Sequence, residues 1–375
     1  MTVPLLSPLV LRGVELPNRI VVSPMCQYSA IEGSATDWHL MHLGQFAVSG
    51  AGLVIVEATH VEERGRITHG CLGLYSDDNE EALGRVLDFC RRHGGARLGL
   101  QLSHSGRKGS ARRPWEGRGE PLPPAEQPWP TVSCTSAPYD TGWPEPLALD
   151  AAGLATVREA HAAAARRAAR IGIDLLELHI AHGYLLHGFL SPLCNTRADR
   201  WGGSLENRMR FPLEVFDAVR AAWPDGRPAG VRVSATDWLE GGWTLEETCE
   251  FARQLKARGC DYLTVSSGGL SLKQQIAIGE GHQLPLAAAV KNASGLPVMG
   301  VGMLFDPHHV NRAIGEGQCD LAAFARGMLS DPHWAWRAAA ALGGEVGYPP
   351  QYIRAYRSPW LRGQRAQLRR PLNSV

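Results

Sequence analysis

Two histidines and a tyrosine stand close together in residues 179–184, HIAHGY. They follow an apolar segment, residues 173–178, that is typical of a buried strand. A buried core does not need such groups, whereas a site that holds a carbonyl oxygen and delivers a proton does. His179 and His182 are therefore candidate donors to a developing oxyanion, and Tyr184 is a candidate proton source.

The histidine pair has two other interpretations. One is a metal site, which needs a third ligand, and Glu177 lies on the same side of the predicted strand as His179. The other is a pair of structural histidines whose ring nitrogens are hydrogen-bonded within the core. The residue types alone leave these alternatives open.

The elements that must position these residues alternate along the chain. Short apolar runs are each followed by a helical pattern, and several runs lack strict alternation, as strands buried on both faces of a parallel sheet do. The predicted strands are residues 19–24, 53–59, 97–102, 174–179, 229–234, 261–266, 297–301 and 320–325. The predicted helices are residues 38–49, 79–93, 151–171, 204–223, 244–258, 284–293, 307–316 and 331–342. Such units predict an α/β fold, a (β/α)8 TIM barrel, with an open doubly wound sheet as the alternative.

Three segments are added to this barrel. A short hairpin around residues 9–16 precedes the first strand, and an insertion rich in proline, glycine and tryptophan, residues 103–150, follows the third. A tail with many arginines and aromatic residues occupies residues 343–375. We expect residues 1–375 to form a single domain, with the insertion among the loops that carry function in such barrels.

Composition limits the classes of partner. The formal net charge of +1 gives no electrostatic reason to expect nucleic acid or an anionic membrane. No apolar stretch reaches the roughly 18 residues that span a bilayer, and no signal-peptide pattern is present at the N-terminus. The 8 cysteines are scattered without a C-x-x-C pair, which argues against a disulfide framework, an iron–sulfur cluster or structural zinc. We therefore expect a cytoplasmic protein.

Residues after the last two predicted strands suit a phosphate group. Strand seven leads into Gly300, Val301 and Gly302, and Arg326 and Gly327 follow strand eight. Glycines allow backbone N–H groups to approach a phosphate, and an arginine can pair with it. Two ordinary tight turns are the alternative.

An arginine also lies inside a predicted strand. Arg232 occupies the middle of residues 229–234, AGVRVS. A guanidinium that points into a barrel needs an anion, because an unpaired buried charge is very costly. A bound ligand and a structural ion pair both meet this need.

Four motifs together resemble the old yellow enzyme family of flavin-dependent ene-reductases, and most closely its bacterial branch with a cysteine near the flavin. They are residues 23–28 (SPMCQY), 101–108 (QLSHSGRK), 179–184 (HIAHGY) and 189–208 (FLSPLCNTRADRWGGSLENR). The resemblance covers about residues 3–340. Trp201 stands where the family usually has tyrosine, and Met303 after the glycines is also less standard.

The resemblance implies a noncovalent FMN at the mouth of the barrel. The residues implied to line the flavin ring are Ser23, Pro24, Met25, Cys26, Ala58 and Gln101. Arg232 is implied to stabilise negative charge on the reduced ring. Those implied to hold the phosphate are Gly300, Gly302, Ala325 and Arg326. Cys26 is implied to tune the flavin potential, with a buried inert thiol as the alternative.

The resemblance also implies a reaction. NADPH or NADH reduces FMN, and hydride then passes to the β-carbon of an alkene conjugated to a carbonyl. His179 and His182 are implied to bind the carbonyl oxygen, Tyr184 to protonate the α-carbon, and Tyr28 to contact the substrate, a small enone- or quinone-like molecule. The alternatives are a metal-dependent barrel lyase or hydrolase that uses His179 and His182, and a flavin-binding protein without turnover.

In this branch the C-terminal tail of one subunit can reach the active site of its neighbour, which implies a homodimer or homotetramer. The tail residues that could do so are Arg354, Tyr356, Arg357 and Trp360, of which we favour Trp360 as a substrate-binding residue. A tail packed on its own barrel is the alternative. Larger relatives that carry an iron–sulfur cluster are disfavoured, because the chain lacks clustered cysteines and the extra length.

Overall fold

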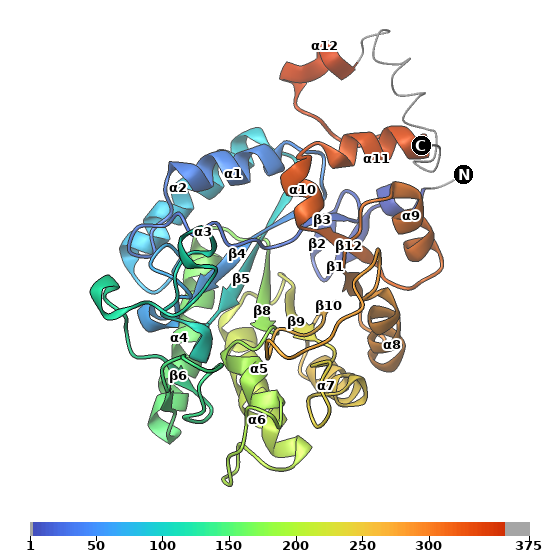
Figure 1. Ribbon diagram of the computed structural model, residues 1–375. Coiled ribbons are helices and arrows are strands. Elements are labelled where there is room, and N and C mark those ends of the chain that lie inside the picture. The colour runs from blue at the N-terminus through green and yellow to red at the C-terminus, as the bar shows by residue number, and fades with distance from the viewer. Residues whose placement is uncertain (1–2, 357–375) are drawn as a thin grey trace.

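The computed structural model describes residues 3–356, which contain a closed barrel of parallel strands (Figure 1). The strands are β3 (Ile20–Val22), β4 (Leu53–His60), β5 (Arg97–Ser103), β8 (Leu175–Ile180), β9 (Ala229–Ser234), β10 (Tyr262–Ser266), β11 (Val298–Gly300) and β12 (Leu321–Phe324). Each pairs with the next in chain order, and β12 closes the barrel on β3. The predicted TIM barrel is confirmed, and the open sheet is wrong.

Helices surround the strands and bury an apolar face against them (Figure 1). Those that follow the strands in the repeating pattern are α1 (Asp37–Ala47), α2 (Asp77–His93), α4 (Ala151–Arg170), α6 (Leu205–Ala222), α7 (Leu245–Ala257), α8 (Leu284–Ser294), α9 (Pro307–Gly315) and α11 (Trp334–Leu342). Residues close to each helix terminus determine where several of these helices begin or end. At α7, for example, Thr244 and Glu247 form a capping box that satisfies backbone N–H groups of the first turn.

The largest difference from the predicted boundaries lies after β12. The last strand ends at Phe324, because Ala325 has φ −108° and ψ −88° and caps an unpredicted short helix, α10 (Arg326–Ser330). The last predicted helix therefore begins at Trp334 rather than at residue 331. A second unpredicted helix, α5 (Leu185–Leu190), follows β8. Both short helices begin at the mouth of the barrel, beside predicted site residues.

The two ends of the barrel differ. The predicted hairpin forms as β1 (Leu9–Leu11) and β2 (Val14–Leu16), and it covers the N-terminal ends of the strands. There Arg97 at the start of β5 donates a hydrogen bond from Nε to the Glu15 carbonyl (3.0 Å). Hairpin leucines join an apolar cluster with inward residues of the strands, including Val21, Leu53, Leu175, Tyr262 and Leu321. This end is an apolar plug.

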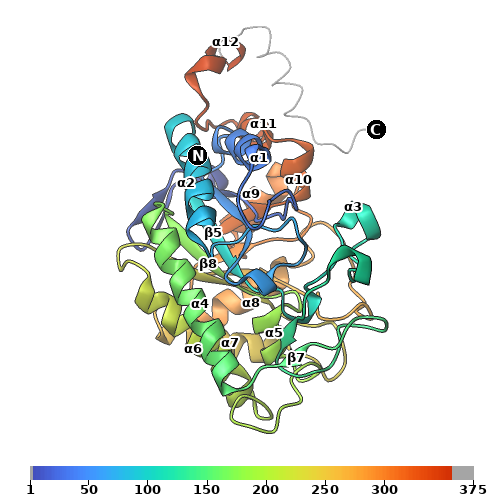
Figure 2. The same cartoon turned by 90° about the vertical axis from the view of Figure 1, so that its left-hand side faces the viewer.

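The insertion lies at the other end, and Figure 2 shows it, with α3 and β7, at the right of the barrel. Its elements are η3 (Gly106–Lys108), α3 (Pro114–Gly117), η4 (Pro124–Glu126), β6 (Val132–Ser133) and β7 (Leu147–Ala148). The guanidinium of Arg107 ties the start of the insertion to its far part by donating to the Pro138 carbonyl (3.0 Å). A further short helix, η2 (Glu63–Gly65), follows β4.

Three more short helices occur near the ends of the described chain. They are η1 (Pro4–Leu6), η5 (Pro350–Tyr352) and α12 (Ile353–Tyr356). The ring of Tyr352 packs edge-on against Trp336 of α11, with 6.0 Å between centroids. Figures 1 and 2 show α12 standing away from the barrel. None of the helices in residues 3–356 is long and apolar enough to cross a membrane.

Candidate active site

The turn after β8, residues 181–184, carries two of the three predicted catalytic side chains. His182 and Gly183 both have left-handed backbone conformations, with φ of 59° and 73°. Such a conformation costs a residue other than glycine about 1–3 kcal/mol, and it persists only where the surroundings enforce it. Here the His182 N–H donates to Ser234 Oγ (2.9 Å), and Lys108 Nζ donates to the His182 carbonyl (2.8 Å). The turn is therefore held in a strained form by side chains from β9 and from the start of the insertion.

The imidazole rings of His179 and His182 meet edge to face, with 5.1 Å between their centroids. The N–H of Ala181 donates to His179 Nδ1 (3.2 Å), so the proton of a neutral His179 ring is on Nε2. That atom lies 3.3 Å from His182 Nδ1, and His182 Nε2 lies 2.8 Å from Ser266 Oγ. Desolvation, aided by the positive charge of Arg232, lowers the pKa of both rings well below the usual value. Both rings are thus neutral. His182 accepts the His179 proton at Nδ1 and carries its own proton at Nε2, so a carbonyl oxygen that approaches the pair would compete with His182 for the His179 proton.

Tyr184 lies against the same ring. Its side chain meets His179 edge to face, with 5.0 Å between centroids, and Lys108 Nζ lies 5.0 Å from the centre of the phenol ring. Desolvation raises the pKa of Tyr184 well above 10, so the phenol keeps its proton at neutral pH. Tyr184 also packs beside Cys26 and Tyr28 on a small apolar cluster at the mouth of the barrel. The structure thus brings the predicted catalytic and substrate-contacting residues together, apart from Trp360, which lies outside the described residues.

Polar side chains also fill the barrel beneath the turn. The buried carboxylate of Glu177 accepts hydrogen bonds from Gln101 (2.7 Å) and from Thr264. Arg232 donates from Nη1 to Ser23 Oγ (3.2 Å), while its buried Nε has no partner among the described residues. Desolvation raises the pKa of Glu177, and the nearby Arg232 opposes this. Arg232 therefore reaches Ser23 at the C-terminal end of β3 while one of its buried N–H groups has no hydrogen-bond acceptor among the described residues.

The loop after β3 carries Ser23, Pro24, Met25 and Cys26 to the same mouth. Gln27 anchors the loop by donating its backbone N–H to Glu57 Oε2 (3.1 Å). A β-bulge between Val56 and Ala58 lets Glu57 reach this loop while Ala58 stays paired with Gln101. Desolvation, with a smaller effect of Glu57, raises the pKa of Cys26 well above 9. Cys26 is therefore a neutral thiol rather than a thiolate nucleophile.

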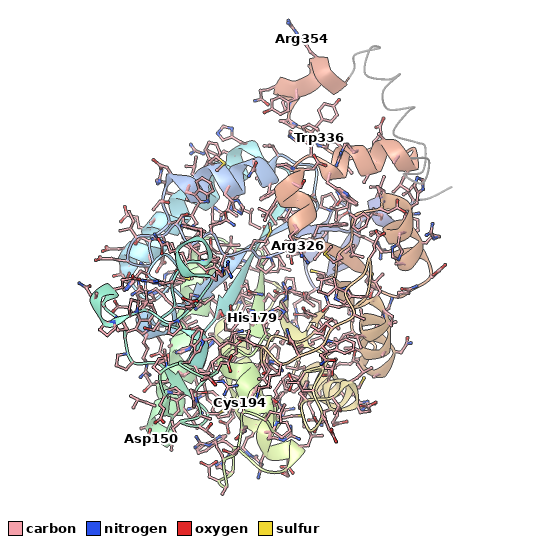
Figure 3. The ribbon with its side chains drawn as sticks, viewed as in Figure 1. Asp150, His179, Cys194, Arg326, Trp336 and Arg354 are labelled. Carbon is pink, nitrogen blue, oxygen red and sulfur yellow. The ribbon has the colours of Figure 1, made fainter. Side chains whose placement is uncertain are left out.

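The predicted phosphate residues form an open rim on the opposite side of the barrel mouth. Gly300 ends β11, and Gly302 has φ 115°, a conformation that side chains rarely adopt. Helix α10 begins after Ala325 without a side-chain cap, so its first N–H groups remain available. Arg326 is exposed, and within residues 3–356 no hydrogen bond or ion pair holds its guanidinium. Figure 3 shows Arg326 on the α10 side of the mouth and His179 near its centre.

These features fit an FMN molecule. An uncapped helix start, a glycine with positive φ and a free guanidinium together form an anion site of the kind that binds a phosphate. The partly satisfied Arg232 suits the electron-rich end of a flavin ring. Ser23 directly follows β3, and Ala58 and Gln101 lie in the C-terminal halves of β4 and β5, the next two strands of the barrel. The donor set therefore matches both the phosphate and the ring of the cofactor.

A metal site is not supported by the same geometry. No group of three or more histidine, cysteine or acidic side chains among residues 3–356 is placed to hold a metal ion. Glu177, the expected third ligand, is bonded to Gln101 and Thr264 instead. The histidines therefore lack the ligand that the lyase or hydrolase alternative requires.

Several residues of the site were not predicted. Glu57 anchors the loop before Tyr28, Ser234 and Ser266 hold His182, and His187 with Asp237 lies behind the turn. His187 was the one with a visible signal, because it is the polar residue in the short apolar run LLHGFL and lies four residues after Gly183. The roles of the others depend on contacts between distant strands.

Comparison with known proteins gives the same answer. A profile described as the NADH:flavin oxidoreductase / NADH oxidase family matches residues 4–344. An NADH:flavin oxidoreductase of Gibberella zeae is 41% identical over 357 residues, which cover 91% of this chain and 86% of the relative. An NADPH dehydrogenase of Geobacillus thermodenitrificans is 37% identical over 355 residues, 94% of this chain and 98% of the relative. The structure of morphinone reductase is similar with a TM-score of 0.75 and 26% identity, covering 92% of each chain.

Proposed function

The chain belongs to the NADH:flavin oxidoreductase / NADH oxidase family, and on that premise we propose that His179, His182 and Tyr184 carry out its reduction of activated alkenes. It is an FMN-dependent NAD(P)H oxidoreductase of the old yellow enzyme type. FMN, when bound, would supply the hydride chemistry between NAD(P)H and the β-carbon of an alkene conjugated to a carbonyl. The proposed substrates are small α,β-unsaturated carbonyl and quinone-like compounds.

The two histidines bind the carbonyl oxygen of the substrate in this proposal. The neutral ring of His179 presents an N–H at Nε2, and His182 lies 3.3 Å from it. Negative charge develops on the carbonyl oxygen as hydride arrives at the β-carbon. Ring N–H groups of His179 and His182 that point at this oxygen therefore stabilise the transition state more than the ground state. The left-handed turn holds His182 in place before the substrate binds.

Tyr184 supplies the proton. Its raised pKa keeps the phenol protonated, and its contact with the His179 ring supports a position beside the carbonyl group that this histidine would bind. The proton leaves Tyr184 Oη for the α-carbon while the electron pair of the enolate forms the new C–H bond. This single observation, a protonated phenol beside two neutral imidazoles at the end of β8, carries the proposal. Tyr28 adds a contact to the substrate.

The cofactor-binding roles follow the geometry of the mouth. Ser23, Pro24, Met25, Cys26, Ala58 and Gln101 line the flavin ring. Arg232 stabilises negative charge on the reduced ring, and the neutral thiol of Cys26 tunes its potential. Gly300, Gly302, Ala325 and Arg326 hold the phosphate, because an uncapped helix start and a free guanidinium favour an anion there.

We also propose that residues 1–375 act as one domain in a cytoplasmic homodimer or homotetramer. All 8 cysteines are free, as expected in a reducing compartment. Helix α12, in the described part of the tail, stands away from its own barrel, which supports a contact between this part of the tail and a neighbouring subunit. Trp360, which lies outside the described residues, is the residue proposed to bind substrate in the neighbouring active site. Light scattering combined with gel filtration measures the state, and truncation after residue 342 should shift it towards the monomer.

Two measurements test the activity. The purified protein should be yellow and should release FMN on denaturation, and 2-cyclohexenone should support NADPH oxidation under anaerobic conditions. A colourless protein that FMN does not reconstitute would contradict the flavin assignment. A yellow protein that oxidises no NADPH with any enone or quinone would instead be a flavin-binding protein without turnover.

A further inference from the structure

A buried histidine and aspartate lie directly behind the catalytic turn. His187 is in α5, and Asp237 follows β9, and neither side chain is exposed to solvent. The backbone N–H of Gly183 donates to His187 Nδ1 (2.8 Å). On the other side of the ring, His187 Nε2 lies 3.2 Å from Asp237 Oδ1. A chain of contacts thus leads from a buried carboxylate to the backbone of the turn.

The contacts determine where the proton of His187 resides. Because Gly183 donates to Nδ1, that nitrogen carries no proton, and the neutral ring must be protonated at Nε2. Nε2 faces Asp237 Oδ1. The contact between them is not well aligned, yet neither atom has another partner among the described residues. His187 is therefore an Nε2–H tautomer that points at a carboxylate.

Hydrogen bonds to one carboxylate oxygen of Asp237 leave the other oxygen facing His187. Its Oδ2 accepts from Ser191 Oγ (2.6 Å) and from the backbone N–H of Trp243 (2.8 Å), which leaves Oδ1 for His187. Burial alone would raise the pKa of Asp237, but His187 and these hydrogen bonds hold it below its usual value. The carboxylate is thus ionised, oriented by its neighbours and aimed at one ring nitrogen.

The turn needs such support because its conformation is strained on a crowded surface. His182 and Gly183 are consecutive left-handed residues. A Cβ atom at Gly183 would lie 2.5 Å from the Gly269 carbonyl oxygen, so the turn already packs tightly against the loop after β10. Lys108 bridges the same two segments by donating to the carbonyls of His182 and Gly269, both at 2.8 Å. Lys108 therefore holds the turn on one side and His187 on the other.

We propose that Asp237 and His187 are a positioning pair that fixes the turn, and with it the side chains of His182 and Tyr184, in the geometry for proton delivery. Neither residue touches the reacting atoms. Asp237 selects the tautomer of His187, His187 accepts from Gly183, and Gly183 separates the two functional side chains. The kinetic part of this inference rests on the proposed function, whereas the tautomer does not.

A hydrolytic triad of Ser191, His187 and Asp237 is the rival interpretation, and the hydrogen bonds contradict it. The hydroxyl of Ser191 donates to the aspartate and not to the histidine. One ring nitrogen of His187 accepts from Gly183 and the other faces Asp237, and all three side chains are fully buried. The imidazole therefore does not contact the serine hydroxyl, as the base of a hydrolytic triad must.

The variant Asp237→Asn tests the tautomer directly. Ser191 and Trp243 would keep the amide oxygen of Asn on their side, which turns the NH2 group towards His187. The His187 ring must then accept at Nε2 and carry its proton on Nδ1, where it meets the Gly183 N–H. Ser191→Ala is the matched control, because Asp237 keeps its bond from Trp243 and its charge. His187→Gln is the conservative variant, since an amide can both accept from Gly183 and donate to Asp237, whereas His187→Leu can do neither.

The experiment has two readouts on the full-length protein. Nitrogen-15 NMR of labelled histidine reports the tautomer of His187 with and without FMN. Stopped-flow absorbance then follows reoxidation of dithionite-reduced enzyme by 2-cyclohexenone, which needs a proton, and by ferricyanide, which does not. We expect Asp237→Asn and His187→Leu to slow reoxidation by the enone about tenfold to hundredfold, as a small misplacement of catalytic groups does, with ferricyanide unaffected. His187→Gln should recover part of the rate, and Ser191→Ala should behave like the wild type.

The outcomes separate the inference from the proposed function. A wild-type His187 protonated at Nδ1, or an Asp237→Asn protein that the enone reoxidises at the normal rate, overturns the positioning pair. If Asp237→Asn does not fold, equal rates for His187→Gln and His187→Leu overturn it. If the enone fails to reoxidise the wild type while the Nε2–H tautomer is present and is lost in Asp237→Asn, the proposed function fails and the positioning of the turn stands.

Discussion

The turn after β8 and the rim formed by Gly300, Gly302 and Arg326 lie at the same end of the barrel, yet they are built in opposite ways. In the turn, side chains from β9 and from the insertion hold the backbone, and hydrogen bonds compensate the strain of His182. At the rim, α10 begins without a cap, and Arg326 has no partner among the described residues. The first region is held by its own contacts, whereas the second presents donors that have no partner among the described residues.

The difference follows from what each region must do. Groups that stabilise a transition state have to be in place before it forms, because reorganising them would add to the barrier. A cofactor phosphate brings its own charge and acceptor oxygens, so its site needs only available donors. Changes in the turn should therefore affect turnover, and changes at the rim should affect cofactor affinity.

The largest effect on turnover is expected from His179→Leu. This change removes the N–H at Nε2 that would bind the substrate oxygen, and loss of one such donor typically lowers the rate about 100-fold to 1,000-fold. Anaerobic steady-state assays with 2-cyclohexenone measure it. The matched control is His161→Leu, which alters a buried histidine of α4 outside the site and should retain both activity and FMN. If the two variants lost activity equally, the loss would reflect packing.

A smaller effect, and on a different quantity, is expected from Arg326→Ala. A hydrogen bond to a charged group contributes about 1.5–3 kcal/mol, so FMN affinity should fall about tenfold to hundredfold. Titration of FMN-free protein, followed by flavin fluorescence, gives the dissociation constant. With saturating FMN, the rate of enone reduction should stay close to that of the wild type. Arg253→Ala, on the outer helix α7, is the control for loss of an exposed arginine. An unchanged affinity in Arg326→Ala would remove the rim from the phosphate site.

The smallest effect concerns stability and pH. Desolvation, with some repulsion from Arg107, lowers the pKa of Lys108 to about 7, from 10.5 for an ordinary lysine. Between these two pH values the unfolded chain binds the proton that the folded protein releases, so Lys108 makes stability rise with pH in this window. The difference in thermal midpoint between wild type and Lys108→Met should therefore shift in favour of the wild type from pH 7 towards pH 10. A difference independent of pH would mean that Lys108 is fully charged in the fold.

Much of the fold was predictable because its signals are local. The strand β9 matches its predicted range at both ends, and the capping box of α7 depends on Thr244 and Glu247, which lie only three positions apart in the sequence. The short helices α5 and α10 were missed because six and five residues are too few to display a helical period. The backbone outlier at Ala325, which ends β12 early, has no local signal of its own.

The site divides in the same way. The sequence motifs predicted His179, His182, Tyr184 and Arg326 as site residues, because reactive side chains at the ends of barrel strands are typical of an active site. The residues that hold them were not predictable, because their contacts join distant parts of the chain, as Asp237 and His187 do across 50 positions. A pattern in sequence shows which groups could react, whereas the groups that orient them are found only by folding.

The most direct test of the central claim compares two half-reactions in Tyr184→Phe. Stopped-flow absorbance measures the reduction of bound FMN by NADPH and its reoxidation by 2-cyclohexenone, each in a single turnover. Because Tyr184 is needed only to deliver the proton, we expect the first rate to be unchanged and the second to fall about 100-fold, the lower range for loss of a general acid. Reoxidation at the wild-type rate would contradict the assignment of Tyr184, and an equal fall in both rates would show that the phenol acts only through packing.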